Sequence, residues 1–135
     1  MEFVDTNVLL YAASTAKEEA DKRAAARSLL DREDLALSTQ VLGEFYVQAT
    51  RVSRAGALSH DDAADLITGL ARYPIQGVTT EIVTRAIATS RRFRISYWDA
   101  AIIEAARELG CSVVLSEDLA DGQDYDGVKV ANPFR

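Results

Sequence analysis

Phe3-Val4-Asp5-Thr6-Asn7-Val8-Leu9-Leu10-Tyr11 is the stretch that decides the fold. Residues 2–4 are predicted to form a short buried strand, and residues 7–13 a helix that begins directly after it. Asp5 interrupts this otherwise apolar run. Burying a carboxylate among apolar side chains is costly unless a partner compensates it, so this junction is the first candidate for a functional site.

The same succession of a short apolar strand and an amphipathic helix recurs along the chain. Ser38 is predicted to cap one helix, and Ser59-His60-Asp61-Asp62 has the form of a capping box for another. The further predicted helices are 18–32, 39–52, 59–73, 80–93 and 97–109, and the further strands are 35–37, 74–78, 112–115 and 128–130. Strands that are apolar without alternation are typical of a parallel sheet covered on both faces, so the sequence predicts an α/β fold. No linker or repeat interrupts it, which indicates a single domain over residues 1–135.

The composition is that of a folded protein, with 48% apolar and 27% charged residues in a chain of 135. The single cysteine, Cys111, cannot form an internal disulfide, which favours a reducing compartment such as the cytoplasm, and we expect it in the core. The N-terminal segment predicts neither a secretory signal nor a membrane span. A net charge of −6 argues mildly against a nucleic-acid partner, unless some of the acids bind cations.

Four acids stand at positions where a shared cation would explain them: Asp5, Glu44, Asp99 and Asp118. Asp5 and Asp118 each follow a predicted strand, and sites in parallel sheets form beyond the C-terminal ends of strands. Glu44 and Asp99 lie beside the apolar stripes of two predicted helices. Converging carboxylates repel one another and burial raises their pKa, so such a cluster usually needs a cation.

Each acid also has a simpler explanation. Asp5 and Asp99 could cap their helices, Glu44 could be solvated, and Asp118 could belong to a turn. Glu117 and Asp121 are alternatives to Asp118 as the fourth acid. Gly43 is unusual inside a helix, and we expect close approach of another backbone or of a substrate there.

A cluster of oxygen ligands favours Mg²⁺ or Mn²⁺, because zinc sites use His or Cys. His60 is predicted in a helix cap and Cys111 in the core, so neither suits a zinc site. Thr6 and Asn7 could orient a metal-bound water. Arg51, Arg91 and Arg92 are candidates for contacts with a phosphate backbone.

Four segments together resemble PIN-domain nucleases, particularly VapC-type toxins. They are Phe3-Val4-Asp5-Thr6-Asn7-Val8-Leu9-Leu10-Tyr11-Ala12, Ser38-Thr39-Gln40-Val41-Leu42-Gly43-Glu44-Phe45-Tyr46, Ile95-Ser96-Tyr97-Trp98-Asp99-Ala100-Ala101-Ile102-Ile103, and Leu115-Ser116-Glu117-Asp118-Leu119 with the ending Val130-Ala131-Asn132-Pro133-Phe134. They occur in the expected order over nearly the whole chain. Ser116 stands where the family more often has Thr, and the serine keeps the hydroxyl group.

The resemblance implies a three-layer α/β/α sandwich with a short central parallel sheet. It also implies a Mg²⁺- or Mn²⁺-dependent endoribonuclease of the cytoplasm, acting as the toxin of a toxin–antitoxin pair, in which metal-activated water hydrolyses RNA. The partners would be a cognate antitoxin and a second copy of the chain, and such dimers often belong to larger toxin–antitoxin assemblies. Asp5, Glu44, Asp99 and Asp118 would be the catalytic and metal-binding acids, supported by Thr6, Asn7 and Ser116.

Two alternatives belong to other classes. A PIN-like scaffold would bind RNA or a protein without cutting. An aspartyl-phosphate hydrolase would use Asp5 as its nucleophile, although Asn7 stands where such enzymes typically have a second aspartate.

Overall fold

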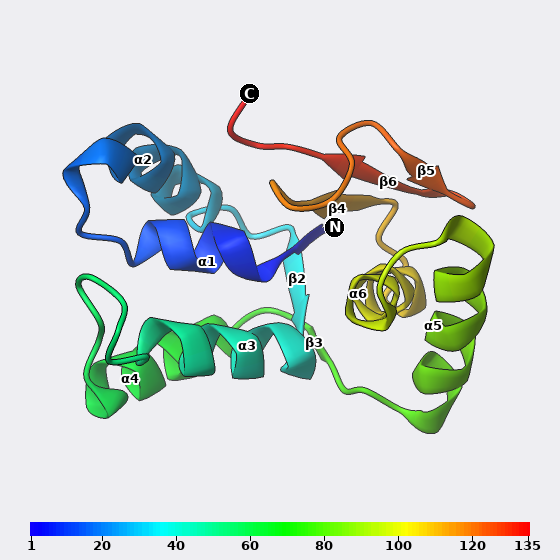
Figure 1. The fold of residues 1–135 in the computed structure, drawn as a ribbon, viewed down its shortest axis with the longest axis horizontal. Helices are drawn as coiled ribbons and strands as arrows, with labels where there is room; N and C mark the ends of the chain where they lie inside the picture. The colour runs from blue at the N-terminus through cyan, green and yellow to red at the C-terminus, as the bar shows by residue number, and fades with distance from the viewer.

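The computed structural model describes residues 1–135 and is built on one six-stranded sheet (Figure 1). The strands are β1 (Glu2–Val4), β2 (Leu35–Ser38), β3 (Ile75–Gln76), β4 (Val113–Leu115), β5 (Asp124–Tyr125) and β6 (Val128–Ala131). Their order is β3-β2-β1-β4-β6-β5. Every neighbouring pair is parallel except β5 and β6, which are antiparallel. The first strand of the chain therefore lies inside the sheet, between β2 and β4.

Helices cover both faces of this sheet. They are α1 (Thr6–Ala12), α2 (Ala20–Leu29), α3 (Thr39–Ala49), α4 (His60–Leu70), α5 (Thr80–Phe93) and α6 (Tyr97–Glu108), with a short 3-10 helix, η1 (Lys17–Glu19), before α2. In Figure 1, α1 to α4 lie on one side of the sheet, and α5 and α6 on the other. The predicted three-layer α/β/α sandwich is confirmed. None of these helices is long and apolar enough to cross a bilayer.

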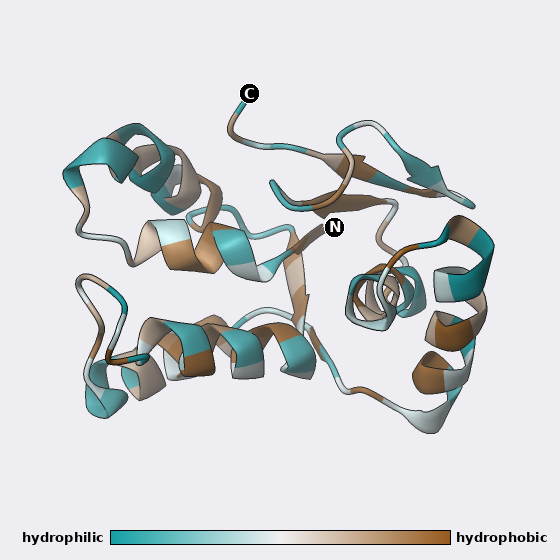
Figure 2. Cartoon of the chain, in the orientation of Figure 1, coloured by the Kyte–Doolittle hydropathy of each residue, from teal (hydrophilic) through white to brown (hydrophobic).

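The core fills the space between the layers. Phe3, Val4, Leu35, Leu37 and Val114 on the central strands are all inaccessible to solvent. Figure 2 shows these strands as hydrophobic along most of their length, whereas the outer surface of α2 is largely hydrophilic. Apolar burial on both faces is the reason that the strands lack alternation. Cys111 is buried as predicted.

The end of α3 differs from the prediction, because the chain after it turns back and packs against the helix end. The helix predicted to reach Val52 ends at Ala49, and Val52 is 96% exposed in the following turn. The amide of Leu58 donates to the carbonyl of Ala49, so the returning chain takes the acceptor that a longer helix would have used. Apolar periodicity alone cannot reveal such a competing contact.

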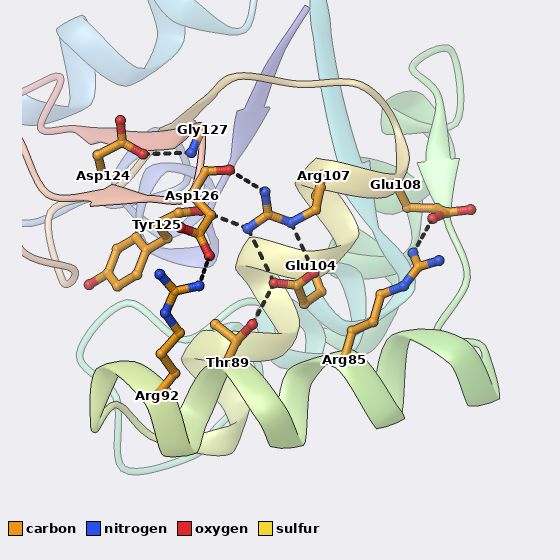
Figure 3. Close-up of polar contacts among 10 residues, drawn as sticks. All are labelled: Arg85, Thr89, Arg92, Glu104, Arg107, Glu108, Asp124, Tyr125, Asp126 and Gly127. Atoms are coloured by element: carbon orange, nitrogen blue, oxygen red, sulfur yellow. Dashed lines mark hydrogen bonds and ion pairs between the residues drawn. The ribbon is translucent and has the colours of Figure 1, made fainter.

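A half-buried ion pair that the sequence did not predict ties α5 and α6 to the turn between β5 and β6 (Figure 3). Glu104 on α6 is only 3% exposed and accepts hydrogen bonds from Thr89 Oγ1 at 2.8 Å and from Arg107 Nε at 3.0 Å. Arg107 also donates to the carbonyls of Tyr125 at 2.6 Å and Asp126 at 2.7 Å. Strand β5, which was not predicted, is held against the rest of the fold by these contacts.

Candidate active site

The site begins where β1 and β4 end side by side. Val4 pairs with Leu115, and the amide of Asp5 donates to the carbonyl of Leu115 at 3.0 Å. The next residues of the two strands therefore meet, and Ser116 Oγ donates to Asp5 Oδ2 at 2.7 Å. Parallel pairing thus brings together two side chains that are 111 residues apart in the sequence.

Asn7, in the first turn of α1, connects the two strand ends. Its Nδ2 group lies 3.4 Å from Asp5 Oδ2, 3.1 Å from Ser116 Oγ and 3.3 Å from Asp118 Oδ2. Its Oδ1 atom accepts from the amide of Glu117 at 3.1 Å. Asn7 therefore fixes the orientation of Asp5 and of the loop that carries Asp118.

Glu44 reaches the same place from α3. Thr6 Oγ1 donates to Glu44 Oε2 at 2.8 Å, and Gln40 Nε2 donates to Glu44 Oε1 at 2.9 Å. Gln40 also donates to the carbonyl of Trp98 at 3.1 Å, which links α3 to the start of α6. The sequence did not single out Gln40, although its position one turn before Glu44 was an available signal.

Asp99 completes the set from the first turn of α6, where Ser96 caps the helix through the amide of Asp99 at 3.1 Å. All four predicted acids line one cavity of about 90 Å³. Its lining comprises Asp5, Thr6, Asn7, Leu10, Gln40, Glu44, Gln48, Trp98, Asp99, Ile102 and Asp118. Asp5 is buried at its base, whereas Asp118 is exposed.

The cavity is strongly acidic, because four carboxylates and no Lys, Arg or His line it. Burial raises the pKa of Asp5 to about 6, and the charges of Asp118 and Glu44 add to this effect, while hydrogen bonds from Ser116 and Thr6 oppose it. Burial also raises the pKa of Asp99, again with contributions from Asp118 and Glu44. A bound cation would lower the pKa of both Asp5 and Asp99, because it stabilises their charged forms.

The donor set suits a hydrated Mg²⁺ or Mn²⁺ ion. No three His, Cys, Asp or Glu side chains lie close enough to bind one ion together. Mg²⁺ keeps several waters and commonly takes only one or two carboxylates directly, so this spacing agrees with its chemistry. The cavity volume also leaves room for an ion with a few waters.

The two alternatives for the fourth acid point elsewhere. Glu117 forms an ion pair with Lys22 and accepts a hydrogen bond from Tyr11, and these contacts lower its pKa. Asp121 accepts from the amide of Asn132 at 2.9 Å and lies 3.5 Å from Arg135. Of the three neighbouring acids, only Asp118 lines the cavity.

The predicted phosphate-contacting arginines lie outside the cavity lining. Arg51 and Arg91 are exposed, and Arg92 pairs with Asp126 on the β5–β6 turn (Figure 3). A contact of these side chains with RNA stays a prediction.

The expected approach of another backbone to Gly43 is wrong. A Cβ atom built on Gly43 would meet no atom within 4 Å beyond its own helix. The remaining expectation for this position is the approach of a substrate.

Comparisons with known proteins agree with this geometry. The sequence model of the PIN domain family matches residues 3–120. No curated protein matches the sequence. Among solved structures, a toxin–antitoxin complex from Klebsiella pneumoniae is similar at a TM-score of 0.71 and 18% identity, covering 98% of each chain.

Two further solved structures have the same fold. VapC20 from Mycobacterium tuberculosis, described as a toxin that cleaves the sarcin–ricin loop, gives a TM-score of 0.69 at 20% identity, over 87% of this chain and 90% of that one. FitAcB from Neisseria gonorrhoeae gives a TM-score of 0.69 at 18% identity over 99% of both chains.

Proposed function

This chain belongs to the PIN domain family, and on that premise we propose that it is a Mg²⁺- or Mn²⁺-dependent endoribonuclease that serves as the toxin of a toxin–antitoxin pair. The observation that supports this most is the convergence of Asp5, Glu44, Asp99 and Asp118 on one cavity without a basic side chain. Structural acids are normally paired with cations or solvated, whereas a metal-dependent nuclease needs unpaired carboxylates in a cleft.

Asp5 and Asp99 would hold the ion directly, and Glu44 and Asp118 would complete the site through its bound waters, since no three acids lie close enough to bind one ion together. A divalent ion bound there lowers the pKa of a coordinated water and neutralises charge that develops on the phosphate. Thr6 and Gln40 hold the Glu44 carboxylate, which would orient the attacking water or accept its proton at a carboxylate oxygen.

Asn7 and Ser116 have a different task, because they hold the Asp5 carboxylate in one orientation. Such fixation keeps a ligand in place while charge shifts during the reaction. Ser116 also receives the amides of Asp118 and Leu119, at 3.1 and 3.4 Å, so the loop after β4 is anchored to the same hydroxyl.

The choice of RNA as substrate and of an antitoxin as partner is supported by the neighbours of the fold. One is described as cleaving an RNA loop, and another is a toxin–antitoxin complex. We propose the same substrate class and partner class here, in the cytoplasm, with residues 1–135 as a single nuclease domain that pairs with a second copy.

The test is RNA cleavage by the purified, antitoxin-free protein with Mg²⁺ or Mn²⁺. Asp99→Ala and Asp118→Asn are expected to lower the cleavage rate by more than about a hundredfold, since even indirect supports of a metal site are worth 10–100-fold. Asp121→Asn is the matched control, because it removes a nearby acid that does not line the cavity. Its rate should stay close to that of the wild type.

Cleavage that persists in Asp99→Ala, or that survives chelation of divalent ions, would contradict the proposal. RNA binding without any cleavage by the wild-type protein would favour a non-enzymatic scaffold. An aspartyl-phosphate hydrolase is not favoured, because no Lys or Arg lines the cavity to bind a transferred phosphoryl group.

A further inference from the structure

Trp98 is the only tryptophan in the chain, and it lies at the acidic cavity with 64% of its surface exposed. Tryptophan is normally well buried, because its large ring gains much from leaving water. An exposed indole beside a cluster of carboxylates is therefore unusual for a purely structural residue. The chain leaves a large aromatic surface open at the place where we propose that RNA is cleaved.

The indole is attached to a firmly held part of the structure. Gln40 Nε2, which also binds Glu44, donates to the Trp98 carbonyl at 3.1 Å. The ring of Tyr97 meets the indole edge-on, with centroids 5.0 Å apart and planes at 80°. Tyr97 itself packs on the buried cluster of Ala86, Ala100 and Ala101 between α5 and α6. The ring is thus positioned before any ligand arrives, which limits the entropy lost on binding.

The charge of the cavity makes an aromatic contact valuable. Nucleic-acid binding usually gains its affinity from Lys and Arg that contact phosphates. Here no basic side chain lines the cavity, and its four acids repel a polyanion. A bound divalent ion compensates only near the phosphate that it contacts. Within the cavity, the base is the part of the nucleotide that can still gain affinity, and stacking on an indole is a contact that any base can make.

We propose that Trp98 stacks on an unpaired nucleobase of the RNA and so positions the adjacent phosphate over the acids. This inference rests on the proposed ribonuclease function. A base inside a duplex is already stacked on both faces, so the contact selects nucleotides in single strands or loops. Trp98 is thus a positioning residue of the substrate, distinct from the acids that perform the chemistry.

The first experiment measures tryptophan fluorescence, excited at the long-wavelength edge where the five tyrosines do not absorb, so that the emission reports on Trp98, the single tryptophan of the chain. A short single-stranded oligoadenylate is titrated into the wild-type protein with Ca²⁺ in place of Mg²⁺, and gel electrophoresis verifies that the RNA stays intact. We expect saturable quenching. An oligomer of the same length whose nucleotides lack bases should bind more weakly and cause no quenching. Equal emission with both probes would overturn the proposal.

The second experiment compares cleavage by Trp98→Ala, Trp98→Phe and the control Ile87→Ala, which removes an exposed apolar side chain on α5. Trp98→Ala is expected to raise KM about fivefold to about a hundredfold, because base stacking on an aromatic ring is worth about 1–3 kcal/mol. Its kcat should change far less. Trp98→Phe should recover most of the lost affinity, since phenyl also stacks, and Ile87→Ala should match the wild type.

The outcomes separate this inference from the proposed function. Cleavage with the same KM in Trp98→Ala and wild type would overturn the stacking role and leave the nuclease in place. Base-dependent quenching without any cleavage would support the stacking role while the nuclease proposal fails. Emission that shifts with protein concentration and does not respond to RNA would mean that a second copy covers Trp98, which would also overturn the proposal.

Discussion

Asp5 couples the folding of the protein to pH, because it is buried beside Asp118 and Glu44 without a positive partner. The pKa of this carboxyl is about 6 in the folded state, against 3.8 for an ordinary aspartate. Between these two pH values the folded protein binds more protons at Asp5 than the unfolded chain does. The free energy of unfolding must therefore fall as pH rises through this window, and it stays at its lower value above it.

Replacing Asp5 by Asn should remove this fall in the free energy of unfolding, because an amide does not titrate. A shift of about two pKa units corresponds to about 3 kcal/mol, so relative to the wild type the metal-free Asp5→Asn protein should gain about that much between pH 4 and neutral pH. Urea denaturation of both proteins with chelator, at pH 4 and at pH 7, measures the change. A difference in stability that stays constant across the two pH values would contradict this assignment.

Some residues of the site could be predicted from the sequence and others could not. The four acids were predicted because Asp5 interrupts an apolar run, Asp118 follows one, and Glu44 and Asp99 lie beside the apolar stripes of helices. These positions are visible without coordinates. Gln40 and Trp98 were not, because a glutamine on a helix and an aromatic at a helix start are ordinary by themselves. Their importance comes from the approach of the start of α3 to the start of α6, where Gln40 donates to the Trp98 carbonyl.

At the scale of elements, α3 contains a glycine that helix formation does not explain. Gly43 is exposed, and an added methyl group would meet nothing beyond the helix. Glycine in a helix interior costs about 1 kcal/mol relative to alanine. Its neighbour Glu44 lines the cavity, so the space above Gly43 is adjacent to the proposed path of the RNA.

Gly43→Ala should therefore stabilise the protein by about 1 kcal/mol. If the RNA backbone approaches α3 here, the same change should raise KM for cleavage although the fold becomes more stable. Thermal unfolding and cleavage kinetics of one preparation measure both effects. A destabilised variant would show that the added methyl group does meet part of the protein, and an unchanged KM would exclude close approach of the substrate.

Helix and strand types were largely predictable, whereas their ends and the small strand β5 were not. The type follows from periodicity and caps, and Ser38, Ser59 and Ser96 all cap helices through their side chains. The ends depend on distant partners, as when Leu58 takes the carbonyl of Ala49. Strand β5 has only two residues, and the distant Arg107 donates to the carbonyls of Tyr125 at its end and of Asp126 in the turn after it, so no local pattern could reveal it.

For the molecule as a whole, the metal should be a stabilising ligand. An ion that binds only the folded state at a hundred times its Kd adds about 2.7 kcal/mol to the free energy of unfolding. In a domain of this size that corresponds to a rise in Tm of about 10 °C. Differential scanning calorimetry with Mg²⁺, and again after chelation, measures the shift.

The control for this experiment is NaCl at equal ionic strength, because a chain with a net charge of −6 also gains from general screening. Asp99→Ala should lose the Mg²⁺-specific part of the shift and keep the response to NaCl. A shift of equal size in wild type and Asp99→Ala would place the stabilising ion elsewhere on the surface.

The pairing of β1 with β4 has a consequence for the moment at which the acidic site can form. Ribosomes add about 5–20 residues per second, so roughly ten seconds pass between the synthesis of the first acid and that of the last. Until β4 has left the ribosome and paired with β1, the nascent polypeptide has no assembled cleft. The order of strands thus acts as a delay during translation, because the four acids can meet only after the chain has been made through Asp118.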